Sequence, residues 1–108
     1  MNAPHVRLIA EYECYPLWMV FEDGSNDISP EMLGLSSDLS REINDWSVEH
    51  DFTYNRSDPA SSGFSSYDDL VAFNSRGKSL ALAVKHELGG RYDVEYFDVV
   101  DGTMKDVQ

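Results

Sequence analysis

The sequence predicts an α+β fold in which two helices pack on one face of a small, mainly antiparallel sheet. Apolar and polar residues alternate near both ends of the chain, which is typical of half-buried strands. Two segments between these ends repeat apolar residues at helical spacing. With 108 residues, 42% of them hydrophobic, the chain is long enough for one core without disulfide bonds, so we expect a single domain over residues 1–108.

The first expected strand alternates from Val6 to Cys14, with Cys14 on its inner side and Glu11 on its polar side. Pro16 cannot donate a backbone hydrogen bond, so this strand ends, bulges or lies at an edge there. The apolar run over residues 17–21 indicates either a second, buried strand or the first strand continuing past a bulge. Residues 22–30 are rich in Asp, Gly, Asn and Pro and predict turns.

Two helices are expected from the apolar spacing. The first begins at residue 37 and runs to about residue 50, with Ser36 or Ser37 accepting a hydrogen bond at its N-terminus. The second covers residues 65–88, where Ser66 followed three residues later by an aspartate approximates a capping box.

Single residues give further detail about packing. Gly77 falls on the apolar face of the second helix, which predicts a close approach by another element. Gly89 follows the last apolar residue of that helix and predicts its C-terminus. Trp18 and Trp46 lie in apolar patterns, so we expect them in the core; exposed tryptophans would instead indicate a binding surface.

The remaining segments are shorter. Residues 52–54 are aromatic and β-branched and predict a brief strand, whereas residues 55–64 have no periodicity and predict a loop. Residues 91–98 alternate and predict a last strand that reaches Val100. Residues 103–108 are expected to form a flexible tail.

The charge restricts the possible partners. Twenty acidic residues oppose eight basic ones, which gives a net charge of −12. Direct binding of nucleic acid or of an anionic membrane is not expected, because both need clustered Lys and Arg. Such a field favours encounters with basic proteins. No apolar run approaches about 18 residues, and the first residues do not resemble a signal peptide, so we expect a cytoplasmic protein.

Acidic side chains are the candidate partner contacts, with residues 38–64 slightly favoured because functional contacts concentrate on long loops. If the two terminal strands were neighbours, Glu11 and Glu13 would share a sheet face with Asp93 and Glu95. That face could bind a cation, act as acid and base, dock a basic protein, or simply be solvated. The candidates are Asp38, Glu42, Asp45, Glu49, Asp51, Asp58, Asp93 and Glu95.

The sequence offers little for catalysis, so no catalytic residue, metal or cofactor is expected. A single cysteine excludes an intramolecular disulfide and the zinc sites built from several cysteines. Residues 23–27 resemble a calcium loop but fail at Ile28 and Gly34, where an EF-hand needs Gly and Glu. No paired histidine motif, nucleophile elbow or phosphate-binding loop occurs. A small enzyme using carboxylates, His50 or Cys14 remains a third-ranked alternative.

Several strings occur together in a familiar combination. They are Cys14-Tyr15-Pro16-Leu17-Trp18, Leu35-Ser36 before a helix containing Trp46, Asp58-Pro59-Ala60-Ser61-Ser62-Gly63-Phe64, and Glu87-Leu88-Gly89 before a Tyr- and Val-rich strand. Over roughly residues 10–97, this pattern resembles the immunity proteins of bacterial polymorphic toxins, including those of contact-dependent growth inhibition.

The resemblance implies a cytoplasmic, non-enzymatic protein that binds and neutralises a cognate toxin domain. Many such toxins are nucleases with basic substrate grooves, so it also implies a basic nuclease as the partner. The alternative is an acidic interaction or regulatory module with another protein target, such as an inhibitor that mimics DNA.

Overall fold

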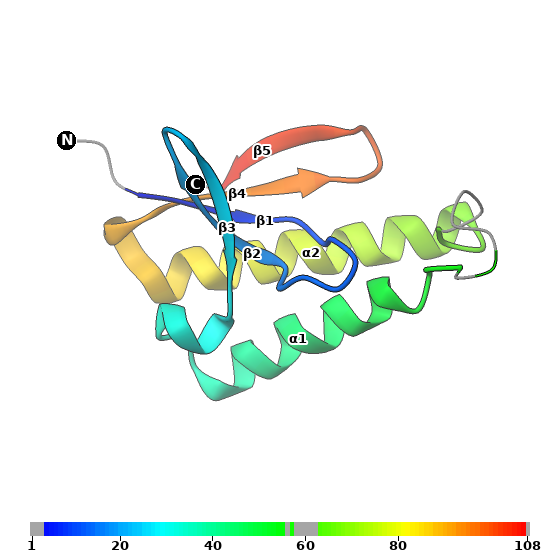
Figure 1. The fold of residues 1–108 in the computed structure, drawn as a ribbon, viewed down its shortest axis with the longest axis horizontal. Helices are drawn as coiled ribbons and strands as arrows, with labels where there is room; N and C mark the ends of the chain where they lie inside the picture. The colour runs from blue at the N-terminus through cyan, green and yellow to red at the C-terminus, as the bar shows by residue number, and fades with distance from the viewer. Residues whose placement is uncertain (1–3, 56, 58–62, 108) are drawn as a thin grey trace.

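The computed structural model describes residues 4–55, 57 and 63–107 (Figure 1). Its sheet contains five strands in the order β3-β2-β1-β4-β5. The elements are β1 (His5–Leu8), β2 (Leu17–Phe21), β3 (Gly24–Ile28), η1 (Pro30–Leu33), α1 (Ser37–Asp51), α2 (Tyr67–Leu88), η3 (Gly89–Arg91), β4 (Asp93–Asp98) and β5 (Thr103–Val107).

The predicted fold class is confirmed. Only β1 and β4 pair in parallel, while the other neighbours are antiparallel. Both helices lie on the same side of the sheet: α2 runs beneath it, and α1 packs alongside α2 (Figure 1). The opposite face of the sheet is covered by no helix in the part of the chain that the structure describes. In that part, no helix has the length and apolar content needed to cross a membrane.

The core lies between the sheet and the two helices. Val6 pairs with Val94, and Leu8 pairs with Tyr96, so alternate residues of β1 and β4 point to the helices and are buried. Ile43 and Trp46 of α1 belong to the same cluster as the buried apolar residues of α2, which are Phe73, Leu80, Ala81, Val84 and Leu88. Fully burying an aliphatic or aromatic side chain contributes about 1.5–3 kcal/mol, so this cluster is the main source of stability.

The expected start of the first helix at residue 37 is confirmed, with Ser36 rather than Ser37 as its cap, whereas the second helix begins at Tyr67, two residues later than expected, with the predicted cap at Ser66. Ser36 Oγ accepts from Leu39 N at 3.2 Å, and Ser66 Oγ accepts from Asp69 N at 3.1 Å. Glu87, near the end of α2, accepts from both Ser36 N and Ser36 Oγ at 2.7 Å, and these bonds lower the pKa of Glu87. The start of α1 is therefore tied to the end of α2.

The first predicted strand is wrong beyond Leu8. Residues 9–16 form a loop, closed by a bond of 2.9 Å from Ile9 N to Pro16 O, and Glu13 has a φ of 61°. A strand cannot continue through that left-handed conformation. Cys14 is therefore a half-buried loop residue rather than a strand residue. Of the two alternatives for residues 17–21, the separate second strand is correct, because β2 covers them, but only Leu17 of β2 is buried.

Two segments predicted to be irregular are strands. Within residues 22–30, β3 pairs with β2 from Phe21 opposite Gly24 to Leu17 opposite Ile28, so only the tip of this hairpin is a turn. The expected flexible tail is wrong over residues 103–107, which form β5 against β4. Both are edge strands, where polar side chains are common because much of the strand faces water.

The predicted strand over residues 52–54 is also wrong. Phe52 N donates to Val48 O at 3.0 Å, and the amides of Thr53 and Tyr54 bond to carbonyls three residues back, so hydrogen-bonded turns follow the end of α1 in this segment. The described residues of the expected loop, which include Asn55 and Phe64, lie outside helices and strands, as predicted. The last strand ends at Asp98 rather than at Val100.

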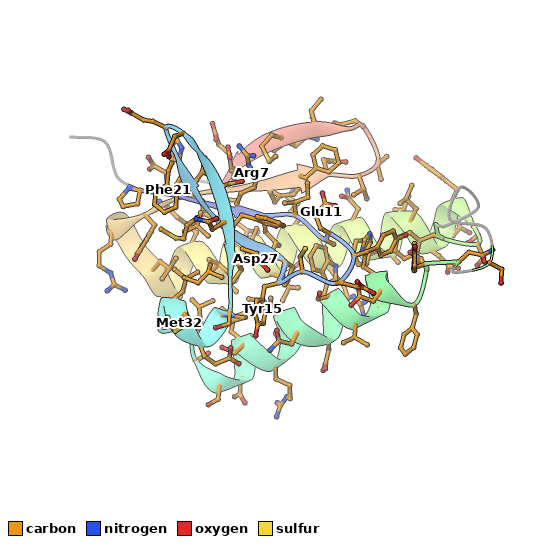
Figure 2. The ribbon with its side chains drawn as sticks, viewed as in Figure 1. Arg7, Glu11, Tyr15, Phe21, Asp27 and Met32 are labelled. Carbon is orange, nitrogen blue, oxygen red and sulfur yellow. The ribbon has the colours of Figure 1, made fainter. Side chains whose placement is uncertain are left out.

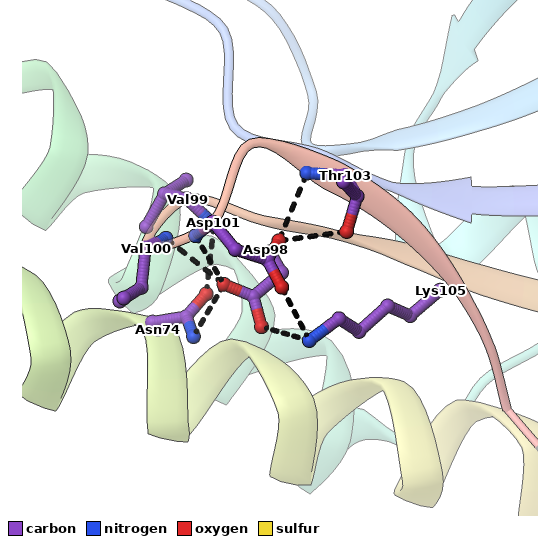
Figure 3. A network of polar contacts seen from close by, with 7 residues as sticks. All are labelled: Asn74, Asp98, Val99, Val100, Asp101, Thr103 and Lys105. Atoms are coloured by element: carbon purple, nitrogen blue, oxygen red, sulfur yellow. Dashed lines mark hydrogen bonds and ion pairs between the residues drawn. The ribbon is translucent and has the colours of Figure 1, made fainter.

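A polar network explains why β5 is ordered (Figure 3). Asp98 is buried at 7% exposure and accepts from Lys105 Nζ at 2.8 Å and from Asn74 Nδ2 at 3.1 Å. It also accepts from the amides of Val100 and Asp101, which shape the turn between β4 and β5. The bond from Lys105 is the largest cause that lowers the pKa of Asp98 to about 2. The network thus joins β4, β5 and α2.

Candidate functional site

A groove of about 440 Å³ lies between α1 and α2. Glu42, Asp45 and Glu49 line it from α1, where their spacing places them on one side of the helix. Arg76 and the smaller side chains of Ser79 and Ala83 line it from α2, and Trp46 and Leu80 complete the lining. The structure therefore brings together three of the acidic side chains predicted as partner contacts.

The charge of this groove is only partly neutralised. Glu49 forms an ion pair with Arg76 across it, but both side chains are about half exposed, so the pair is screened by water. Glu42 and Asp45 make no ion pair with any residue that the structure describes. The groove can therefore offer free carboxylates to a cationic ligand or partner.

A second hollow, of about 350 Å³, shares Glu49 with this groove. Its lining includes Phe52 from the end of α1, Phe64 from the segment before α2, and Asp69 from the first turn of α2. The ring of Phe64 packs against that of Phe73, with centroids 4.8 Å apart, which fixes the wall of this hollow to the core. The two hollows together form a surface that is acidic and partly apolar.

Apolar side chains protrude beside these hollows, and the sequence pattern did not indicate them. Phe52 is 85% exposed and Val48 is 49% exposed. Val48 follows Asp45 by three residues and precedes Phe52 by four, so all three lie on one face of the helix. Helical spacing extended past residue 50 would have placed Phe52 on the same face as Val48. The aromatic and β-branched composition of residues 52–54 predicted a strand instead.

The other candidates from this side of the molecule lie outside the groove. Asp38, in the first turn of α1, pairs with Arg41 at 3.3 Å. Asp51 faces the loop of residues 9–16, where its carboxylate accepts from Glu13 N at 3.2 Å. Asp58 lies outside the described residues.

Asp93 and Glu95 lie on the uncovered face of the sheet, away from the helices. β1 and β4 are neighbours, as hypothesised, but Glu11 and Glu13 lie in the loop after β1 rather than on a strand, and Glu11 lines a hollow together with Arg7 and Trp18. Instead, Arg7 Nε bonds to Glu95 Oε1 at 2.7 Å, and His5 Nε2 lies 3.4 Å from Asp93 Oδ2. Instead of the expected row of carboxylates, this face carries two pairs, each made of one basic side chain and one carboxylate.

The two tryptophans differ in their surroundings. Trp46 is buried in the core, as expected, with 6% exposure. Trp18 is only half-buried; it pairs with Arg7 on the uncovered face of the sheet, and its Nε1 donates to Ile9 O at 3.0 Å. Trp18 therefore stabilises the loop after β1 rather than the core.

The side chains considered for catalysis are not activated. Burial is the largest cause that raises the pKa of the Cys14 thiol, and the nearby carboxylates of Asp27 and Glu11 raise it further. A thiol in this state is a poor nucleophile. His50 is half-buried, and burial lowers its pKa, although Asp51 and Glu11 act in the opposite direction. Among the described residues, no group of three or more His, Cys, Asp or Glu side chains could hold a metal ion.

A family model described as Serratia CdiI immunity protein-like matches residues 4–99. The match includes every described element except β5. No curated protein matches the chain.

Proposed function

The chain belongs to the Serratia CdiI immunity protein-like family, and from this premise we propose that it binds a cognate toxin domain, a basic nuclease, and neutralises it. The resemblance to immunity proteins of contact-dependent growth inhibition is thereby confirmed. The protein acts as an inhibitor and catalyses no reaction of its own. It works in the cytoplasm of the cell that makes it, where the incoming toxin would otherwise act.

The observation that carries this proposal is the acidic groove between α1 and α2. Glu42 and Asp45 present carboxylates there that no described cation neutralises, on a chain with a net charge of −12. A nuclease needs cationic side chains to hold the phosphates of its substrate. An acidic surface that binds over those side chains, or beside them, excludes the nucleic acid.

Protection in the cell tests the function itself. A toxin domain encoded beside this gene is co-expressed with the protein, and growth is compared with that of cells that make the toxin domain alone. We expect growth to be restored, and we expect the purified protein alone to cleave neither DNA nor RNA. A toxin that remains lethal in the presence of the well-expressed protein would refute the proposal.

Association kinetics test the position of the contact. Reversing two charges in the groove, Glu42→Lys with Asp45→Lys, should slow association with the toxin domain by about tenfold or more at low salt. The matched control reverses Glu22 and Asp23, exposed acids at the tip of the β2–β3 hairpin that line neither hollow. Equal slowing by both double variants would mean that the overall charge steers association, not the groove.

A further inference from the structure

The far end of α1 combines exposed apolar side chains with the acidic groove. Phe52 has the highest exposure of the large hydrophobic side chains described, at 85%, and Val48 is 49% exposed. An exposed phenyl ring contributes little to the stability of the isolated protein, because it buries little surface on folding. Aromatic side chains, phenylalanine among them, are enriched in the cores of protein interfaces.

The backbone fixes where Phe52 points relative to the acids. The bond from Phe52 N to Val48 O extends the helix by one residue, so Phe52 lies one turn beyond Val48. Glu49 lies between them in sequence, lines both hollows and contacts Arg76. Phe52 therefore lines the second hollow together with Glu49, which connects it to the acidic groove, whereas Val48 lies one turn back and lines neither hollow.

The helix that carries these side chains is held rigidly. Ile43 is fully buried, and the ring of Trp46 stacks on that of Phe73 with centroids 4.4 Å apart. Backbone that is already held in place loses little conformational freedom on binding, which favours affinity. The backbone of Phe52, directly after α1, is therefore positioned before a partner binds.

We propose that Phe52, supported by Val48, is the apolar anchor of the interface and enters an apolar pocket on the toxin that is bordered by lysines or arginines. This inference rests on the proposed function and adds the anchor and the chemistry of its receptor. Charge complementarity selects the occupant: Glu49 beside the anchor, and Asp45 and Glu42 on the preceding turns of α1, need cationic neighbours in the partner. The second hollow could receive an arginine from the border of the toxin's pocket. Phe64 and Ala72 would contact the aliphatic part of that arginine, and Asp69 would bind its guanidinium group.

The anchor and the acids should control different rates. Charges at the edge of an interface act mainly on association, whereas a desolvated side chain at its centre acts mainly on dissociation. Phe52→Ala should therefore speed dissociation from the toxin domain by about tenfold or more, while changing the association rate and its salt dependence little. Val48→Ala should have a smaller effect in the same direction.

Met32→Ala is the matched control. Met32 lies on η1, near the N-terminal end of α1, and is 77% exposed, so the variant removes a similarly exposed apolar side chain at the other end of the helix (Figure 2). Its dissociation rate should stay within about twofold of that of the unmodified protein. Phe52→Trp, which retains a large aromatic ring, should dissociate more slowly than Phe52→Ala.

The outcomes separate the two proposals. If the unmodified protein binds and neutralises the toxin, but Phe52→Ala and Met32→Ala dissociate alike, the anchor is refuted and the proposed function stands. If the unmodified protein neither binds nor neutralises it, the proposed function is refuted, and the anchor with it. Phe52→Ala and Met32→Ala should unfold at the same temperature as the unmodified protein, because the side chains of Phe52 and Met32 are exposed.

Discussion

Gly77 of α2 lies directly against the indole ring of Trp46 on α1, so that a Cβ atom at residue 77 would be 2.8 Å from Cζ2 of that ring. The ring itself is held, since Trp46 Nε1 donates to Phe73 O at 3.0 Å. The close approach expected from the sequence is thus confirmed. Because Trp46 also lines the acidic groove, this contact sets the spacing of the two helices that form the groove.

Gly77→Ala should therefore destabilise the protein. Alanine is about 1 kcal/mol more favourable than glycine inside a helix, so free space at this position would make the variant more stable. Overpacking against a fixed ring costs about 1–3 kcal/mol, which outweighs that gain. Urea unfolding measures the difference, and Ser75→Ala, at an exposed position of the same helix, is the control. An increase in the free energy of unfolding for Gly77→Ala would show that the Trp46 ring moves aside easily.

His50 should make the fold sensitive to mild acid. Its ring stacks on Tyr12 at 4.4 Å and lies 5.8 Å from Phe73, and burial lowers its pKa in the folded state. The unfolded chain, where the pKa of His50 is about 6.5, therefore takes up the proton first as the pH falls. The stability that depends on neutral His50 is complete above this pH and is lost as the pH falls towards the folded-state value.

His50→Phe tests this dependence because it keeps a stacked ring and removes the titration. We expect the free energy of unfolding to fall less between about pH 7 and pH 5 for this variant than for the unmodified protein. The control is His86→Gln at an exposed position of α2, which should keep the original slope. If the free energy of unfolding depends on pH in the same way for His50→Phe and for the unmodified protein, burial of neutral His50 does not cause the loss of stability in mild acid.

Asp98 should stabilise the fold at neutral pH. The bond from Lys105 and those from the turn amides hold its pKa at about 2, below the ordinary value of 3.8. The stabilisation is therefore complete above that ordinary value and is lost as the pH falls through about 2. Asp98→Asn should lower the unfolding midpoint at pH 7, and the deficit should shrink in strong acid. Asp106→Asn, on the exposed side of β5, should show neither effect.

The elements that sequence alone could predict are those whose signal is local. Both helices carry their own caps and apolar spacing, so Ser66, and Ser36 as one of two candidates with Ser37, follow without tertiary information. β3 and β5 carry no such signal, because an edge strand is specified by its neighbour in the sheet. In β5, Lys105 lies opposite buried Tyr96, and its inward position depends on Asp98 of another strand.

The candidate site was predictable to the same extent. Glu42, Asp45 and Glu49 share one helix, so their common side follows from spacing. The opposite wall comes from α2, and nothing in the local sequence indicates that Arg76 meets Glu49. Phe52 was missed because an aromatic, β-branched triplet resembles a strand, whereas here it forms hydrogen-bonded turns directly after α1.

Arg76 is the cation that lines the acidic groove, and its removal should strengthen steering of a basic toxin. Arg76→Ala frees the carboxylate of Glu49 and makes the groove more negative, so association should quicken by about two- to fivefold at low salt. Its cost in stability should be below about 1 kcal/mol, because the ion pair is exposed.

Lys78→Ala separates a local effect from a general one. Lys78 is an exposed residue of α2 that does not line the groove, yet its removal changes the net charge of the chain by the same amount. If the groove receives the toxin, Arg76→Ala should quicken association more than Lys78→Ala does, and stopped-flow fluorescence at several salt concentrations measures both. Equal rates would show that the field of the whole molecule acts without a preferred groove. Slower association of Arg76→Ala would show that the guanidinium itself binds the toxin, because removing that interaction would then outweigh the more negative field.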